Sequence, residues 1–235
     1  QAAMNGLITA YRQLDDTPNA TQYATRLANH HAAQARVAVD RDEQDPDEVK
    51  LHSWLMFVCE ATADRWRLAG RTAQAIATLE QGVECVPEQF EMRARMAELL
   101  AAEGSLQRGA EVLQQGCQLA PTKAEHWNTL ALYCMKSRQL PLAATALEQL
   151  VSLQPDNATA YALFAQVQMA PQRNPQQGVE YAQRAVELSP TAGHHYILAT
   201  ALYHVGDLPG AREHLNAAIA LEPDNREFRE ALAKL

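Results

Sequence analysis

The chain has 235 residues and a formal net charge of −8 at pH 7, and it contains no run of basic residues. This balance argues against binding of nucleic acid or capture by anionic lipid, because both depend on clustered Lys and Arg. No apolar run reaches the roughly 18 residues that a membrane helix needs, so direct membrane insertion is not expected. Hydrophobic residues make up 47% of the chain but aromatic residues only 6%, which favours helices over a β-sandwich.

A helix is predicted to begin at Pro46, because proline is favoured in the first turn of a helix and Asp45 precedes it. Apolar residues between Val49 and Trp66 keep a helical spacing as far as Gly70. The pattern predicts a helix of about 24 residues, roughly 36 Å long.

Five similar phrases follow along the chain, and each ends in proline: ATLEQGVECVP, EVLQQGCQLAP, TALEQLVSLQP, EYAQRAVELSP and EHLNAAIALEP. The prolines, which are 34, 34, 35 and 33 residues apart, are Pro87, Pro121, Pro155, Pro190 and Pro223. A period near 34 residues predicts a helix-turn-helix unit stacked on copies of itself, because one unit cannot bury its own apolar face.

The clearest copy spans residues 124–157 and reads AEHWNTLALYCMKSRQLPLAATALEQLVSLQPDN. It resembles the tetratricopeptide repeat (TPR) family, whose signature positions are occupied here by Trp127, Leu130, Ala131, Ala143, Leu147 and Pro155. The resemblance implies an all-α fold, a right-handed superhelical solenoid of antiparallel helix pairs. It also implies a protein whose role is to bind other proteins.

The repeat divides the chain into three expected parts. Residues 46–223 hold five units, at about 46–89, 90–123, 124–157, 158–191 and 192–225. Residues 1–45 are expected to form two N-terminal helices, GLITAYRQLDDTPNA and TQYATRLANHH, as a degenerate repeat or a cap. In residues 226–235 one helical stripe, which predicts a capping helix or the start of a further repeat, contains Phe228, Ala231, Leu232 and Leu235.

Small residues recur where two helices of a unit are expected to cross. The first-helix positions are Ala63, Ala97, Ala131, Ala165 and Ala199, and the second-helix positions are Ala75, Gly109, Ala143, Gly178 and Ala211. Helices approach closely only where the crossing residue has little side chain, so we expect all of these positions to be buried. Gly70, Gly104 and Gly206 follow helical runs and are expected to end them with positive φ.

In the TPR family the first helices line the concave surface, and fixed offsets of each unit point into it. Carried over to this chain, those offsets predict a partner-binding groove made of Phe57, Glu60, Asp64, Arg67, Glu91, Glu98, Glu125, Asn128, Leu132, Met135, Lys136, Gln166, Tyr196, Thr200, Tyr203 and His204.

The N-terminal half of this predicted groove is acidic, and the C-terminal half mixes neutral polar with aromatic groups. A protein or peptide partner with a basic segment would therefore be complementary to it. The alternative is that these are solvated faces of a spacer. Co-chaperones of the family that grip a C-terminal carboxylate use Lys and Asn at positions held here by Glu60, Asp64, Ala94 and Glu98, so an acidic floor argues against that subclass.

No catalytic, cofactor-binding or metal-binding residue is predicted, and no enzyme activity is expected. The histidine pairs His30–His31 and His194–His195 are adjacent in sequence, so their side chains diverge by about 100 degrees on a helix and cannot form a one-faced ligand pair. The cysteines lack the spacing of redox or zinc motifs. We expect Cys59 and Cys134 to be buried and unreactive.

The leading interpretation is a noncatalytic scaffold that binds a peptide or protein partner in its concave groove. One alternative is a TPR arm of a larger enzyme or of an envelope export or secretion assembly. Another is a self-assembling structural spacer, because unfinished ends of an array expose apolar flanks. A soluble protein, or a domain of a longer protein, in the cytoplasm or periplasm is compatible with all three.

Overall fold

The structure, a computed structural model, describes residues 46–171 and 173–235. The two helices predicted within residues 1–45 lie outside this range. The described residues contain eleven helices and no strand, which confirms the all-α prediction. The helix expected at Pro46 begins there and ends at Leu68. The chain forms two compact units, of which one ends at Ala120 and the other begins at Pro121.

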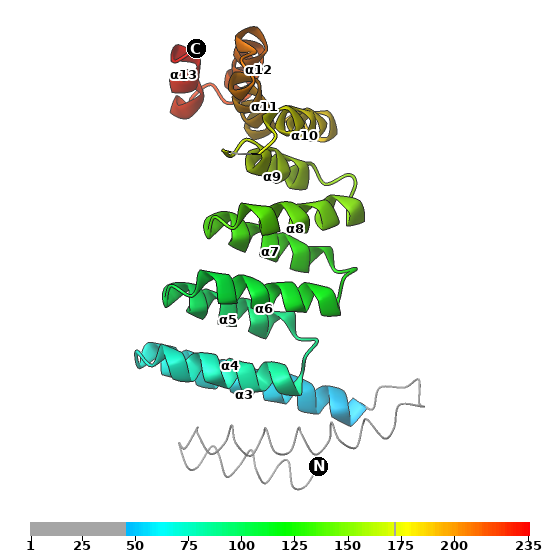
Figure 1. Cartoon of the computed structure of the whole chain (residues 1–235), viewed down its shortest axis with the longest axis vertical. Helices are drawn as coiled ribbons and strands as arrows, with labels where there is room; N and C mark the ends of the chain where they lie inside the picture. Colours follow the sequence, from blue (N-terminus) through cyan, green and yellow to red (C-terminus); the bar gives the residue numbers. More distant parts are fainter. Residues whose placement is uncertain (1–45, 172) are drawn as a thin grey trace. The chain divides into compact units, whose positions relative to one another are not determined.

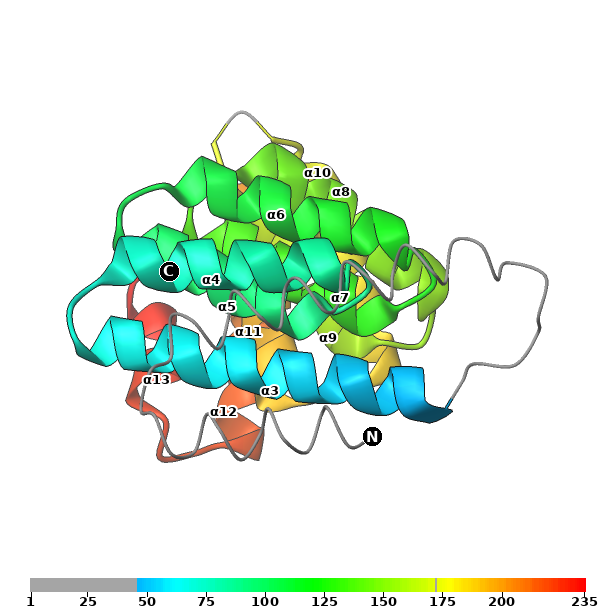
Figure 2. The ribbon, with the colours of Figure 1, turned by 90° about the horizontal axis from the view of Figure 1, so that it is seen from below.

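The described part of the first unit contains two helix pairs (Figures 1 and 2). Its described helices are α3 Pro46–Leu68, α4 Thr72–Cys85, α5 Phe90–Ala102 and α6 Leu106–Leu119. Consecutive helices pack on one another. The first helix, α3, has 23 residues against 14 in α4, and its N-terminal turns extend beyond α4 in both views.

The second unit continues the same alternation of helices and short turns (Figure 1). Its helices are α7 Ala124–Lys136, α8 Leu140–Leu153, α9 Ala158–Gln168, α10 Pro175–Leu188, α11 Ala192–His204, α12 Leu208–Leu221 and α13 Arg226–Ala233. Each helix packs on the next one in sequence, and α9 also contacts α11. First helices of adjacent pairs, α9 and α11, therefore lie side by side.

Small side chains fill the helix crossings, as expected. The five first-helix alanines are at most 4% exposed, and all five second-helix positions are buried. Gly116 lies at a further close contact between α5 and α6, where a larger residue does not fit. A β-carbon built there would lie 2.7 Å from a ring carbon of Phe90 and 2.9 Å from Cδ of Arg93. Close approach of α5 and α6 thus depends on the missing side chain.

The same type of hydrogen-bonded turn ends four of the first helices, namely α3, α5, α7 and α11. In α5 the amide of Gly104 donates to Ala101 O and the amide of Ser105 donates to Leu100 O, at 3.0 and 2.8 Å. This is the Schellman pattern, which requires positive φ at the second residue past the end of the helix. Gly70, Gly104 and Gly206 take φ of 72°, 80° and 83°, which confirms the prediction. Arg138 occupies the same place after α7 with φ of 58°, and the amides of Arg138 and Gln139 donate the same pair of bonds, to Met135 O and Cys134 O.

In α5 and α7 the fourth residue of the helix donates a hydrogen bond to the carbonyl of the preceding proline. Trp127 is 8% exposed, and its indole Nε1 donates to the carbonyl of Pro121 at 2.9 Å. In α5 the equivalent position is Arg93, whose Nη2 donates to the carbonyl of Pro87 at 3.1 Å. Burial lowers the pKa of the Arg93 guanidinium. The Arg93 guanidinium therefore makes the same hydrogen bond to a proline carbonyl in α5 that the Trp127 indole makes in α7.

The four cysteines are buried thiols, as expected for small core residues. Burial raises the pKa of Cys59 to about 12 and that of Cys134 to about 11. A thiol reacts through its thiolate, so both are protonated and unreactive near neutral pH. Cys59 packs in the core of the first unit with Ile76, Leu79 and Met92.

Candidate functional site

In the first unit the predicted groove residues lie on α3 and α5. Phe57 on α3 is 69% exposed, and Glu91 and Glu98 on α5 are also exposed. Glu60 and Asp64 are partly exposed, and Arg67 is exposed one turn beyond Asp64. All six side chains are thus at least partly accessible.

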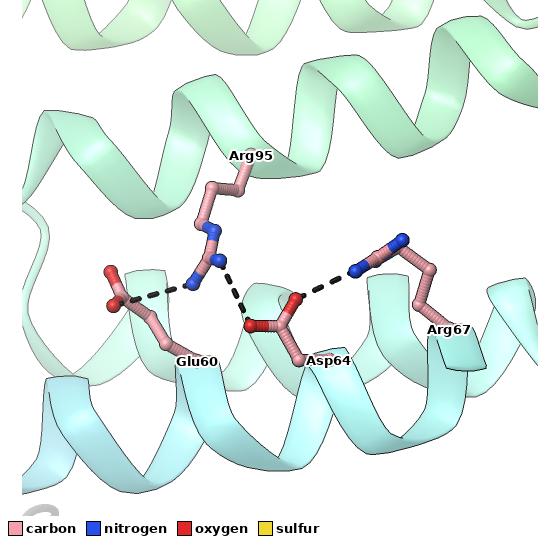
Figure 3. A network of polar contacts seen from close by, with 4 residues as sticks. All are labelled: Glu60, Asp64, Arg67 and Arg95. Atoms are coloured by element: carbon pink, nitrogen blue, oxygen red, sulfur yellow. Dashed lines mark hydrogen bonds and ion pairs between the residues drawn. The ribbon is translucent and has the colours of Figure 1, made fainter. Parts of the chain in front are cut away.

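Arg95 joins three of these residues into one network (Figure 3). It extends from α5 towards α3, where its Nη1 lies 3.3 Å from Glu60 Oε2 and its Nη2 lies 2.9 Å from Asp64 Oδ2. The other oxygen of Asp64 lies 3.5 Å from Arg67 Nε. Asp64 is therefore shared by two guanidinium groups.

Arg95 changes the electrostatic interpretation of this face. Four carboxylates, Glu60, Asp64, Glu91 and Glu98, were expected to make it acidic, but two of them are engaged by Arg95. Among the described residues, no cation pairs with Glu91 or Glu98. The negative charge available to a partner is therefore concentrated on α5.

The sequence contains a signal that could have identified Arg95. Arg95 lies 31 residues after Asp64. This separation is three residues, or about one helical turn, shorter than the repeat period of 34 residues. Residues at this separation face each other on α3 and α5. Reading each first helix separately identified the acidic residues but missed the cation that connects them.

A pocket of about 310 Å³ lies beside this network. Its lining residues come from α3, α4 and α5 and are Ala63, Asp64, Arg67, Leu79, Arg95, Glu98, Leu99 and Ala102. Leu79 is 1% exposed and Ala63 is buried, so an apolar floor lies below a rim of charges.

In the second unit, α7 presents its predicted groove residues with mixed chemistry. Glu125 and Lys136 are exposed, and Asn128 and Met135 are partly exposed. Leu132 is 39% exposed. This helix therefore offers an apolar side chain between residues of both charges.

The remaining predicted residues lie on α9 and α11. Gln166 on α9 and His204 on α11 are exposed. Tyr203 is 53% exposed, and its ring meets that of His204 edge to face, with centroids 6.2 Å apart. The end of α11 thus presents two rings to solvent.

Tyr196 and Thr200 are engaged within the second unit. The Tyr196 ring lies against Phe228 of α13, with centroids 5.0 Å apart. Burial and a hydrogen bond with Glu227 raise the Tyr196 pKa. Thr200 Oγ1 donates to the backbone carbonyl of Tyr196 at 2.8 Å. Both side chains stabilise this end of the chain as well as being partly exposed.

One contact between two histidines was not predicted from the sequence. His195 on α11 and His214 on α12 place their Nδ1 atoms 3.0 Å apart, and their rings stack with centroids 5.3 Å apart. The described residues contain no group of three His, Cys, Asp or Glu side chains placed to hold a metal ion. None of the described helices is both long and apolar enough to cross a bilayer.

Two family models, both described as tetratricopeptide repeat, match residues 128–193 and 192–235. The comparison with curated proteins gave no match. Among solved structures, MamA residues 41 to the end from Desulfovibrio magneticus RS-1 is 24% identical, with a TM-score of 0.57 over 72% of this chain and 96% of that one.

A second similar structure is YrrB, described as a TPR protein with an unusual peptide-binding site. It is 15% identical, with a TM-score of 0.58 over 76% of this chain and 91% of YrrB. At these identities the likeness concerns the fold. Four observations support a tetratricopeptide repeat family: the proline-terminated period, the buried small residues, the family models over residues 128–235 and the fold of the solved structures.

Proposed function

We propose that the chain is a noncatalytic scaffold that binds a peptide or protein partner along its first helices. The proposal rests on one observation, which is the difference in solvent exposure between two sets of residues. Small residues at the crossings are buried, whereas the charged, polar and aromatic residues predicted for the groove are at least partly exposed. Exposed side chains on a preformed helical framework bind with a small ordering cost.

The chemistry of the first helices favours a partner with a basic segment and an apolar segment. Glu91 and Glu98 offer carboxylates that have no cation partner among the described residues. In the second unit Leu132 and Tyr203 offer apolar and aromatic surface. Charge complementarity would set the orientation of the partner, and the apolar contacts would add affinity.

We also propose that five helix pairs are the repeat units. They are α3 with α4, α5 with α6, α7 with α8, α9 with α10, and α11 with α12, and α13 would then be a cap or the start of a further unit. Phe228 supports the capping role, because it is 4% exposed and packs with Ala192 and Ala218.

The proposal is tested by selecting binders to the full chain from a library of random twelve-residue peptides and measuring affinities by fluorescence anisotropy. Leu132→Asp should weaken selected peptides that use the second unit by at least about fivefold, as for a residue within an interface. The matched control is Leu153→Asp on the second helix α8, because Leu153 is 37% exposed and Leu132 is 39% exposed.

A charge test addresses the first unit in the same assay. The double variant Glu91→Lys, Glu98→Lys should weaken basic peptides, while the exposed control pair Glu84→Lys, Glu103→Lys should not. Failure to select any peptide that binds saturably would argue for a spacer. Light scattering over a concentration series addresses the self-assembling alternative, since the apparent mass of a stacking chain rises with concentration.

A further inference from the structure

The pocket between α3, α4 and α5 combines an apolar interior with a charged rim. Leu79 and Ala63 are buried beneath it, and Leu99 and Ala102 complete its apolar surface. Its volume of about 310 Å³ lies at the lower end of the range for small-ligand sites. A single long side chain is an occupant of suitable size.

The charged groups of the pocket are unevenly paired. Two carboxylates, Asp64 and Glu98, and two guanidiniums, Arg67 and Arg95, line it, and Glu60, outside the lining, also pairs with Arg95. Arg95 engages Glu60 and Asp64, and Arg67 engages Asp64 (Figure 3). Among the described residues, Glu98 has no hydrogen-bond or ion-pair partner for its carboxylate. The group that would complete this arrangement is a cation beside Glu98.

The helix register shows why the position beside Glu98 is open. Asp64 and Arg95 face each other across α3 and α5 at a separation of 31 residues. One helical step further on each helix lie Arg67 and Glu98, also 31 residues apart. Arg67 lies against Asp64 on its own helix instead of pairing with Glu98. An ion pair between Arg67 of α3 and Glu98 of α5 is therefore not formed.

We propose that this pocket receives a lysine or arginine side chain of the bound partner, with its charged end on Glu98. The aliphatic stem would pack on Leu79 and Leu99, because basic side chains bury their methylene groups while the head stays in a polar environment. An acidic side chain would approach guanidiniums that are already engaged and would be repelled by Glu98. This inference rests on the proposed binding function and specifies which partner residue the first unit recognises.

The probes are four blocked pentapeptides, acetyl-Ala-Ala-X-Ala-Ala-amide, in which X is lysine, arginine, norleucine or glutamate. Each is titrated to 10 mM into the isotopically labelled full chain, and amide chemical shifts are followed by NMR. The lysine and arginine peptides should shift the amides of Ala63, Leu99 and Ala102. They should bind about two- to fivefold more tightly than norleucine, as expected for one partly exposed ion pair.

Two variants test the assignment of the pocket. Glu98→Gln should reduce the lysine peptide to the affinity of the norleucine peptide, and Glu84→Gln, an exposed carboxylate of α4 outside the pocket lining, should leave it unchanged. Ala102→Met is placed at an exposed lining position and should reduce binding of both peptides by filling the pocket. Added salt should reduce the lysine preference, because exposed ion pairs are screened.

Equal binding of lysine and norleucine, tighter binding of glutamate, or lysine binding that Glu98→Gln leaves unchanged would each overturn the inference. So would a lack of shifts at these amides with 10 mM lysine peptide. In those cases saturable binding of library-selected peptides would leave the proposed scaffold function standing. Loss of both results would remove the function and the inference together.

Discussion

Arg93 and Arg95 lie two residues apart on α5 and have opposite roles. Arg93 is 6% exposed and holds the turn at Pro87, whereas Arg95 is partly exposed and bridges Glu60 and Asp64. Residues two apart on a helix point in different directions, so one arginine enters the core and the other enters the candidate site. The residue type alone could not separate them, but their register within the repeat does.

The same comparison shows what sequence reasoning could predict at single residues. Ala131 and Ala199 were expected at helix crossings and are 0% and 2% exposed, because the repeat fixes which position meets the neighbouring helix. The contact between His195 and His214 was not expected. It depends on the rotation of α11 against α12, which a spacing along one helix does not contain.

His195 predicts how stability changes with pH. Burial and the neighbours His214 and His194 lower the pKa of His195. The unfolded chain, with a His pKa near 6.5, therefore binds more protons between the lowered pKa and about pH 6.5. Stability should rise with pH through that window and be lost as pH falls through it.

Thermal unfolding at pH 5.0 and pH 7.5 measures this loss. His214→Asn removes one cause of the lowered His195 pKa, so the variant should lose less stability on acidification than the wild-type chain. His204→Asn changes an exposed histidine on the same helix as His195 and serves as the control. Equal acid sensitivity of all three proteins would contradict the role of the pair.

At the scale of elements, the turn after each first helix decides where the helix ends. Gly70, Gly104 and Gly206 were recognised from sequence because glycine adopts positive φ without a steric penalty. Arg138 could be aligned with them by the period, and it takes the same conformation with φ of 58°. The turn geometry is therefore imposed by the packing of α7 and α8 even where the residue is unsuited to it.

Arg138→Gly should stabilise the chain. A left-handed conformation costs a non-glycine residue about 1 kcal/mol or more, and part of that gain is offset by the greater entropy of glycine in the unfolded chain. We expect a net gain of about 0.5 kcal/mol, measured by denaturant unfolding with an unchanged m value.

Gly104→Ala provides the reverse control for this prediction. A β-carbon at Gly104 would have no atom within 4 Å, so its effect comes from the backbone conformation and not from a clash. The substitution should destabilise the chain by about 1 kcal/mol. A loss of stability in Arg138→Gly would show that the arginine side chain contributes more than its conformation costs.

At the scale of the molecule, the period predicted most of the fold because each contact is repeated at a fixed spacing. The buried small residues and the turn glycines follow from it, whereas the helix that begins at Pro46 was predicted from its proline and its apolar spacing. The candidate site was harder to predict from the sequence, because it depends on which side chains meet between neighbouring first helices. Glu60 and Asp64 were identified as exposed acids, but their engagement by Arg95 required the register of α3 against α5.

Because the contacts are local, we expect a destabilising substitution to lower stability mainly in the helices around it. Within each compact unit the described helices pack on their neighbours in sequence, with α9 and α11 as a near-neighbour pair, so stability should be distributed along the chain. Leu198 is 0% exposed and packs with Ala165, Ala182 and Ala201, and Leu198→Ala should remove about 2–5 kcal/mol of local stability. Hydrogen exchange of the full chain should show faster exchange in α9–α12 and unchanged protection in α3–α5. A uniform loss of protection from α3 to α13 would instead mean that the chain unfolds as one cooperative body, and the additive description of its repeats would be wrong.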